Sequence, residues 1–294
     1  MTHIISFINF KGGVGKTTTL VQVAETLSAV HKKKVLVLDL DPQTNATVAL
    51  IGDTEWQKVD AAQQTLAHLF FDQLDGTSNF DISRAVIHGV SNLPGSTIDL
   101  IPSSIHLVEV QDRLSDISVR SAWTMAPMEV VKLELGSLFS SYDFVLIDCP
   151  PNLGFITQNG LEVSDYYVTP VVPDMLSTYG LPQIIRRIHA HATRRKLKVQ
   201  SLGVVITKYD SRRAVHDDTR RLLPRMLAGY YTKAGAVPAD MFRTVIPAAN
   251  RYSEVMDYSL PMSNYKEKWG TSASGGQQLY TYPQQLTQEI LDRL

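Results

Sequence analysis

The sequence has one cysteine, Cys149, among its 294 residues. It therefore excludes intrachain disulfides and metal sites built from several cysteines. No apolar run approaches the roughly 18 residues that a membrane-spanning helix needs, and Met1-Thr2-His3 leads straight into an apolar run, which leaves no room for a signal peptide. We expect a soluble, cytoplasmic protein without a membrane span, in which Cys149 is a small buried residue.

Strong overall charge is also missing. The chain has 28 Lys+Arg and 29 Asp+Glu, a net charge of −1, and it is 44% hydrophobic with a mean hydropathy of −0.06. This composition suits one large α/β core. We predict a single domain over residues 1–294, with 264–294 forming a small-residue loop and a last helix.

A glycine-rich loop, Phe10 to Thr18, directly follows the apolar run Ile4 to Ile8. Glycines in such a loop let successive backbone N–H groups turn toward an anion, and the N-terminus of the following helix adds partial positive charge. Lysine and threonine at its end can hold the β and γ phosphates and Mg²⁺, respectively. The predicted phosphate-binding residues of this loop are Gly12, Gly13, Val14, Gly15, Lys16, Thr17 and Thr18.

Carboxylates follow two further apolar runs. Asp39 and Asp41 come at the end of the run that starts at Val35, and Asp148 ends the run from Phe144. Strands buried on both faces read as continuous apolar runs, and polar groups at their carboxyl ends reach the ligand crevice. A carboxylate there can hold Mg²⁺ or orient an attacking water, although each could also be a helix cap.

The loop reads K-G-G-V-G-K-T-T, with Phe10 where the usual phosphate-loop pattern has glycine and with the additional Lys11. In this the chain resembles the ParA/MinD family of deviant Walker A P-loop ATPases, and more particularly its ParA (Soj-like) partition branch. Four further blocks match in family order, so the resemblance spans residues 2 to about 260. They are Val35–Gln43, Phe144–Pro151, Val204–Asp210 and Val245–Pro247.

The resemblance implies an α/β P-loop NTPase fold, a mostly parallel twisted sheet flanked by helices on both faces, with ATP and Mg²⁺ as cofactors. It assigns Asp41 to water activation, Asp148 and Thr17 to the metal, and Asp39 to support of the metal site. It also implies that Lys16 binds phosphate and that Lys11 reaches across an ATP-dependent homodimer to the partner's phosphates. It places Gly12 at the dimer interface and Thr207 and Pro247 around the base.

Charge is unevenly distributed along the chain. Residues 1–179 carry 10 Lys+Arg against 20 Asp+Glu, whereas residues 180–266 carry 16 against 6, a net +10. Without a helix-turn-helix or zinc motif, a basic face would bind DNA through phosphates, independently of sequence. A solvated helix face is the alternative. The predicted DNA contacts are Arg186, Arg187, Arg194, Arg195, Lys196, Arg220 and Arg221, and the neighbouring candidates are Lys198, Arg212, Arg213 and Arg225.

Other segments carry structural predictions. We expect helices over 61–71, 105–114, 128–139 and 283–294, and 52–95 lies in the stretch that varies most among relatives. MinD proteins end in a basic membrane-binding helix. The last helix here has one cation, Arg293, beside Glu289 and Asp292, which favours packing on the core. The lone cysteine argues against the cluster-binding relatives, the nitrogenase iron protein and the iron–sulfur scaffold ATPases.

The leading functional hypothesis is an ATPase that dimerises on ATP, binds nonspecific DNA and segregates plasmid or chromosomal DNA with a ParB-like adaptor, so that it associates with the nucleoid. One alternative is a ParA-like ATPase that positions a protein cargo, such as a microcompartment or chemoreceptor cluster. A MinD-like membrane-associated ATPase and a DNA-coating protein gated by nucleotide are the others.

Overall fold

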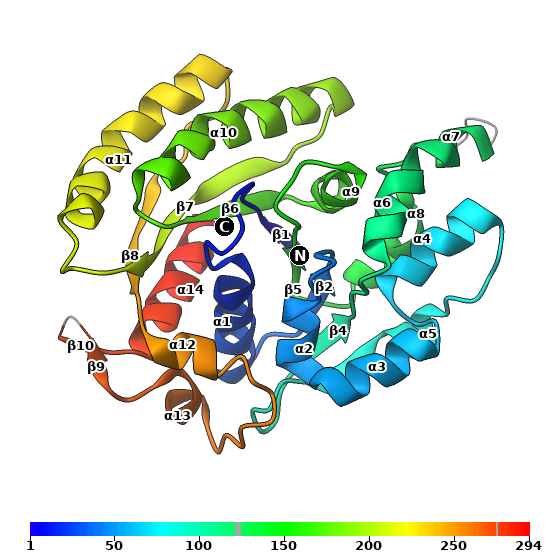
Figure 1. The fold of residues 1–294 in the computed structure, drawn as a ribbon, viewed down its shortest axis with the longest axis horizontal. Helices are drawn as coiled ribbons and strands as arrows, with labels where there is room; N and C mark the ends of the chain where they lie inside the picture. Colours follow the sequence, from blue (N-terminus) through cyan, green and yellow to red (C-terminus); the bar gives the residue numbers. More distant parts are fainter. Residues whose placement is uncertain (121–124, 275) are drawn as a thin grey trace.

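The computed structural model describes residues 1–120, 125–274 and 276–294. Within them, one eight-stranded sheet runs through the molecule in the order β3-β4-β2-β5-β1-β6-β7-β8 (Figure 1). Every neighbouring pair is parallel except β3 with β4. The strands are β1 His3–Phe7, β2 Val35–Asp39, β3 Ile87–Val90, β4 Ile98–Ile101, β5 Phe144–Asp148, β6 Tyr166–Val171, β7 Gln200–Tyr209 and β8 Met241–Pro247, with a small hairpin of β9 Ala273–Ser274 and β10 Gln277–Gln278.

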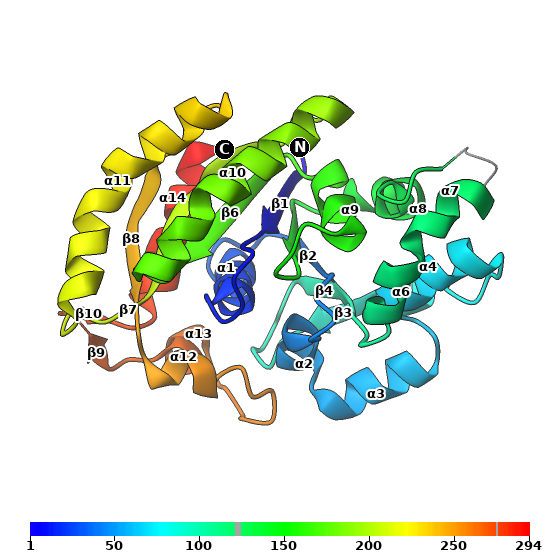
Figure 2. The ribbon, with the colours of Figure 1, turned by 45° about the horizontal axis from the view of Figure 1, so that its top comes forward.

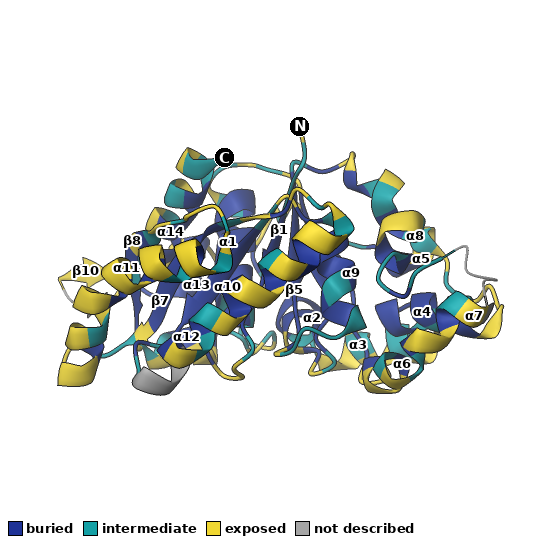
Figure 3. Ribbon diagram, turned by 90° about the horizontal axis from the view of Figure 1, so that it is seen from above, coloured by how far each residue is buried: buried dark blue, intermediate teal, exposed yellow. Residues whose placement is uncertain are grey.

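Helices cover both faces of the sheet, and they leave the strands as the buried centre of the molecule (Figures 2 and 3). The helices are α1 Lys16–Ala29, α2 Asn45–Ile51, α3 Asp53–Ala61, α4 Leu66–Asp75, α5 Ile82–Ala85, α6 Leu107–Arg113, the 3-10 turn η1 Leu114–Asp116, α7 Ile117–Arg120, α8 Val130–Phe139, α9 Phe155–Val163, α10 Met175–Arg195, α11 Ala214–Ala234, α12 Asn250–Glu254, α13 Tyr265–Trp269 and α14 Thr281–Arg293. The predicted α/β fold with a mostly parallel sheet is confirmed.

Alternation along each strand divides the core into two layers. In β2, Val35 and Val37 pack toward α1 and α14, whereas Leu36 and Leu38 pack toward α4, α8 and α9. Successive side chains of a strand point to opposite faces. Because both faces are covered, the strand reads as the continuous apolar run seen in the sequence.

The segment between β2 and β3 differs from the helix predicted over 61–71. The structure ends α3 at Ala61, and α4 starts at Leu66 after a turn in which Gln63 has φ 59°. A left-handed residue interrupts a helix, so the prediction joined parts of two helices. The helices predicted over 105–114 and 128–139 are confirmed as α6 and α8, with later starts.

The C-terminal helix packs on the core, as its sequence predicted. Leu286 and Ile290 of α14 are fully buried against α1 and β8. An apolar stripe that is already covered in this way is not exposed for a membrane surface. Among the described residues, no helix is long and apolar enough to cross a membrane.

A buried ion pair fastens the C-terminal segment to α1. Lys268 Nζ lies 2.6 Å from Glu25 Oε1, and both side chains are inaccessible to solvent. Trp269 Nε1 donates to Glu25 Oε2 at 2.9 Å, and Ser91 Oγ donates to Oε1. A buried charge without its partner is costly, so this cluster ties residues distant in sequence to the helix that follows the glycine loop.

We expect Lys268→Met to lower the free energy of unfolding by about 3–5 kcal/mol, because it strands the buried Glu25 carboxylate. Urea denaturation measures the loss. The double variant Glu25→Met/Lys268→Met is the control, and it should lose less than the single variant. Equal stability of Lys268→Met and the unchanged protein would show that the pair does not fasten the segment.

Candidate functional site

The glycine loop lies between β1 and α1 in a strained form that glycine permits. Gly13 has φ 73° and Gly15 has φ 83°, both in the left-handed region that other residues rarely adopt. Lys16 begins α1 and is only 6% exposed. A lysine is seldom buried without an anionic partner, so this placement suits a residue that faces bound phosphate.

Strand register brings the carboxylates to the loop. Asp148 of β5 pairs with Phe7 of β1 on one side and with Asp39 of β2 on the other. The Thr17 hydroxyl donates to Asp148 Oδ2 at 2.6 Å, whereas the buried Oδ1 has no hydrogen-bond partner among the described residues. Hydroxyl and carboxylate oxygens are the ligands that Mg²⁺ prefers, so these two residues fit a metal site.

The charges of the site also favour a cation. Burial, followed by repulsion from Asp39, raises the pKa of Asp148 well above its usual range. Burial raises the pKa of Asp39 to about 7, against the opposing effect of its hydrogen bonds from Thr47. Two buried carboxylates side by side are stabilised when a divalent cation shares their charge.

Asp39 does not present free oxygens to that metal as a direct ligand would. Its Oδ2 accepts hydrogen bonds from the backbone N–H and hydroxyl of Thr47, both at 2.8 Å, and its Oδ1 accepts from the Asp41 N–H at 3.1 Å. The structure therefore gives Asp39 a holding role: it shapes the loop between β2 and α2. Its predicted support of the metal site is indirect.

Asp41 lies on that loop and faces the cavity above the glycine loop. The Gln43 N–H donates to its Oδ1 at 3.0 Å, and Ser103 Oγ donates to its backbone carbonyl at 2.7 Å. Burial raises its pKa, while Lys16 acts in the opposite direction. A fixed carboxylate beside a phosphate site can orient and deprotonate water.

The cavity has a volume of about 650 Å³, which is ample for a nucleotide. The glycine loop and Asp41 form part of its lining, and the remaining lining residues carry no individual functional prediction from the sequence. They are Gln43, Asn45, Val48, Ala49, Pro151, Lys208, Ser253 and Met256. Pro247, predicted to contact the base, is buried at the end of β8 and is not among these lining residues.

Thr207, near the end of β7, contacts the backbone of the glycine loop. Its hydroxyl lies 2.7 Å from the Val14 carbonyl and 3.2 Å from the Val171 carbonyl. A hydroxyl has one proton to donate, and here it is directed to the chain's own backbone. The structure thus adds a contact to the loop itself, and the base contact of Thr207 stays a prediction.

Lys11 extends from the loop toward the start of α10. Its Nζ lies 3.2 and 3.3 Å from the two carboxylate oxygens of Asp174, and both side chains are partly exposed. Exposed ion pairs of this kind contribute at most about 1 kcal/mol. Lys11 therefore has an anionic partner within its own chain, but this weak ion pair can be exchanged for one with another anion.

The basic residues lie on α10 and α11, and in the segments that directly follow α10 and precede α11; the two helices run along one side of the sheet (Figures 1 and 2). The exposed ones are Arg186, Arg187, Arg194, Lys196, Lys198, Arg212, Arg213, Arg220, Arg221 and Arg225. Arg195 is different: it forms ion pairs with Glu129 and with Glu162, whose side chain is 1% exposed. This network ties α10 to α9 and holds Arg195 within its own chain, and its predicted DNA contact stays a prediction.

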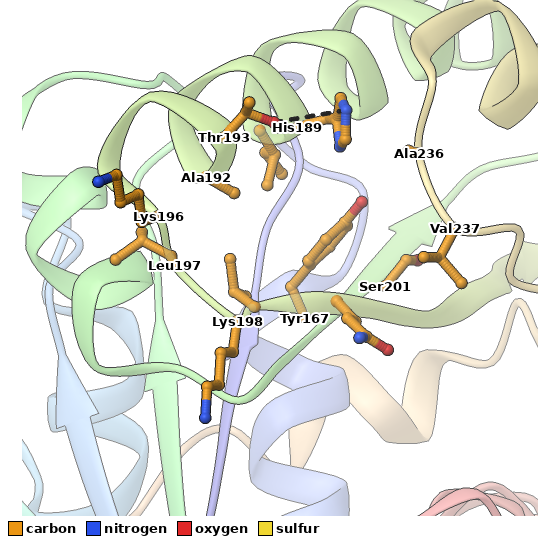
Figure 4. Close-up of a pocket in the computed structure, with 13 residues that line it drawn as sticks. Tyr167, His189, Ala192, Thr193, Lys196, Leu197, Lys198, Ser201, Ala236 and Val237 are labelled. Atoms are coloured by element: carbon orange, nitrogen blue, oxygen red, sulfur yellow. Dashed lines mark hydrogen bonds between the residues drawn. The ribbon is translucent and has the colours of Figure 1, made fainter.

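A second cavity, of about 300 Å³, lies at the end of α10, and Figure 4 shows its lining. His189 and Thr193 lie one turn apart on α10 on the same side of this cavity, with Thr193 Oγ1 3.5 Å from His189 Nε2. The ammonium groups of Lys196 and Lys198 are directed away from it. These two charges therefore serve the outer surface and do not converge on a small ligand.

The comparisons agree with this geometry. The sequence model of a family described as "AAA domain" matches residues 2–201. The sporulation initiation inhibitor protein Soj of Bacillus subtilis is 31% identical over 265 residues, which are 90% of this chain and 92% of Soj. Cobyrinic acid a,c-diamide synthase of Mycobacterium smegmatis, solved with ADP and magnesium, superimposes with a TM-score of 0.66 at 25% identity, covering 88% of this chain and 91% of the other.

McdA of Cyanothece shares the fold, with a TM-score of 0.73 at 21% identity and coverage of 99% of this chain and 100% of McdA. The glycine loop, the aspartate at the end of β5 and the parallel sheet define a P-loop NTPase fold. With the match to Soj over most of both chains, the protein belongs to the ParA/MinD family of P-loop proteins, within its ParA (Soj-like) group.

We expect Asp148→Asn to stabilise the protein at pH 8 in the presence of EDTA, by about 1–3 kcal/mol, the usual cost of a buried polar group without a partner. A raised pKa in the folded state means that the ionised carboxylate costs stability at high pH and that the cost disappears as the pH falls. The gain should therefore shrink toward pH 5. Urea unfolding at both pH values, with the exposed Asp240→Asn as control, measures it, and destabilisation at pH 8 would contradict the account.

Proposed function

We propose that the protein is an ATP hydrolase of the ParA type, which closes into a dimer on ATP and moves DNA. The single observation that carries the proposal is the Thr17–Asp148 pair, with its unpartnered carboxylate oxygen, beside a glycine loop and a cavity of nucleotide size. A site of this kind needs both a cation and an anion to be satisfied. MgATP supplies the two together.

Each residue then has a physical task. The loop N–H groups and Lys16 bind the phosphates, and Thr17 and Asp148 would hold Mg²⁺, which would supply positive charge against the phosphates. Asp41, fixed by Gln43 and Ser103, orients the attacking water and accepts its proton. Asp39 keeps this loop in place through Thr47.

The first test of this proposal separates binding from hydrolysis. Lys16→Ala should abolish ATP binding, because it removes the buried charge that faces the phosphates. Asp41→Ala should retain binding and lower phosphate release by at least about 100-fold, the usual contribution of a catalytic base. Nucleotide titration and a phosphate-release assay measure the two effects. Exposed Lys58→Ala is the control, and equal loss of ATP affinity in both variants would reject these roles.

In the proposed ATP dimer, Lys11 contacts the nucleotide bound by the partner subunit. In the single chain Lys11 rests on Asp174, a weak contact that phosphate can replace. Gly12 supports the same proposal: it is exposed, and a Cβ at this position would meet nothing within 4 Å inside the chain. The space there is open for close approach by a second subunit.

Lys11→Ala should therefore leave ATP binding by the monomer within about twofold of the unchanged protein and prevent dimer formation. The cradle of Lys16, Thr17 and the loop amides is untouched by this change, whereas an intermolecular contact is lost. Light scattering with a nonhydrolysable ATP analogue measures the mass. A variant that still forms the dimer on the analogue would show that Lys11 is not the residue that crosses the interface.

Nonspecific DNA is the proposed ligand of the ATP dimer. The exposed arginines and lysines of α10 and α11 form a basic face, and a dimer brings two such faces to one duplex. Binding through phosphates is indifferent to sequence and falls steeply with salt. Arg195 is excluded from this face because Glu129 and Glu162 already bind it.

We expect Arg194→Ala/Lys196→Ala to weaken ATP-dependent DNA binding by about tenfold or more at 100 mM salt, without changing nucleotide affinity. Gel shifts on two unrelated duplexes, with ADP and with ATP, measure it. Arg84→Ala, an exposed arginine on α5, is the control. Equal binding with ADP and ATP would reject the gating, and absence of any DNA binding would favour a protein surface as the track.

For the cargo, we propose plasmid or chromosomal DNA carried by a ParB-like adaptor that stimulates hydrolysis, with the ATP form on the nucleoid in the cytoplasm. Similarity to Soj and to the chromosome partitioning protein ParA of Caulobacter vibrioides, 29% identical over 292 residues, supports this choice. A protein cargo is the second candidate. Co-purification from cells with the Asp41→Ala variant distinguishes them by whether a DNA-bound adaptor or a protein assembly is retained.

A further inference from the structure

Two side chains at the end of β7 donate hydrogen bonds to two consecutive carbonyls of the glycine loop. Lys208 Nζ donates to the Gly13 carbonyl at 2.7 Å, and Thr207 Oγ1 donates to the Val14 carbonyl at 2.7 Å. Residues about 195 positions apart in sequence therefore meet on the side of the loop that faces β7. The predicted roles of the loop residues do not account for this contact.

The direction of a carbonyl decides the direction of the neighbouring amide. In a trans peptide the C=O of one residue and the N–H of the next lie in one rigid plane and point in opposite directions. Among the described residues there is no cis peptide bond. When Lys208 holds the Gly13 carbonyl, the Val14 N–H must point away from Lys208, and when Thr207 holds the Val14 carbonyl, the Gly15 N–H must point away from Thr207.

The backbone at Lys208 indicates that this contact is maintained against a cost. Lys208 has φ 51°, a left-handed conformation that is unfavourable for a residue with a side chain. Its side chain also lines the cavity with Gly13 and Gly15. Thr207 packs closely as well, since a Cβ on Gly15 would lie 3.7 Å from its side chain.

We propose that Lys208 and Thr207 are positioning residues that set the phosphate-facing direction of the Val14 and Gly15 amides before a nucleotide binds. The ligand that benefits is the β-phosphate of a nucleoside di- or triphosphate, because the loop amides cradle this group. The inference rests on the nucleotide binding proposed above. It adds a lysine outside the loop to the binding site, with a role distinct from those of Lys11 and Lys16.

The test uses Lys208→Met, which removes the ammonium group and keeps an unbranched side chain of similar size. Methionine is no easier than lysine in the left-handed region, so the comparison isolates the hydrogen bond. Lys233→Met, an exposed lysine in the last turn of α11, is the matched control. Titration with a fluorescent ADP analogue and with ATP should show a Kd about fivefold higher for Lys208→Met and unchanged for Lys233→Met.

The loss should be equal for ADP and ATP, since both carry the β-phosphate. Thr207→Val, which removes the hydroxyl and keeps the shape, should produce a similar loss through the Gly15 amide. Protein labelled with ¹⁵N-valine supplies an independent measurement, and Val14→Ile identifies the Val14 signal. We expect Lys208→Met to shift or broaden that signal in the nucleotide-free protein, with an unchanged Tm.

An unchanged Kd for Lys208→Met would overturn the inference. A raised Kd with an undisturbed Val14 signal would overturn the argument from peptide direction. Both results leave the proposed function intact, because the unchanged protein still binds nucleotide. Failure of the unchanged protein to bind ADP or ATP would instead overturn the proposed function.

Discussion

The site depends on the register of three parallel strands. Phe7 of β1, Asp148 of β5 and Asp39 of β2 lie at one level across the sheet, so the glycine loop and two buried carboxylates meet at the same edge. The two carboxylates repel each other in a place that water cannot reach. A bound divalent cation would relieve this repulsion and so stabilise the centre of the protein.

The carboxylates of Asp148 and Asp39 suit different roles because their hydrogen bonds differ. Asp148 keeps one oxygen unpartnered, which suits a metal. Asp39 accepts hydrogen bonds from Thr47 and Asp41 with its two oxygens, which suits a residue that holds the loop carrying Asp41. A similar division applies behind the loop, where Thr207 and Lys208 hold carbonyls. Groups that bind the ligand are therefore backed by groups that bind the backbone.

Much of this arrangement could be predicted from residue order. A loop of the form K-G-G-V-G-K-T-T after an apolar run predicts a phosphate cradle, and the apolar runs that end in Asp39 and Asp148 predict parallel strands with polar carboxyl ends. Local signals do not reveal contacts with partners that are distant in sequence. The hydrogen bonds of Thr207 and the ion pairs of Arg195 depend on which atoms face them, and the turn at Gln63 depends on one backbone angle.

The sequence by itself determined the fold class, the phosphate loop and the family, because these follow from local patterns of glycine, charge and hydrophobicity. Only the tertiary structure decided which polar atoms remain available for a ligand. Arg195 and Arg194 are neighbours in the chain, yet Arg195 is bound by Glu129 and Glu162 whereas Arg194 is exposed. The physical reason is that a hydrogen bond or ion pair uses up a donor, and its partner can lie anywhere along the chain.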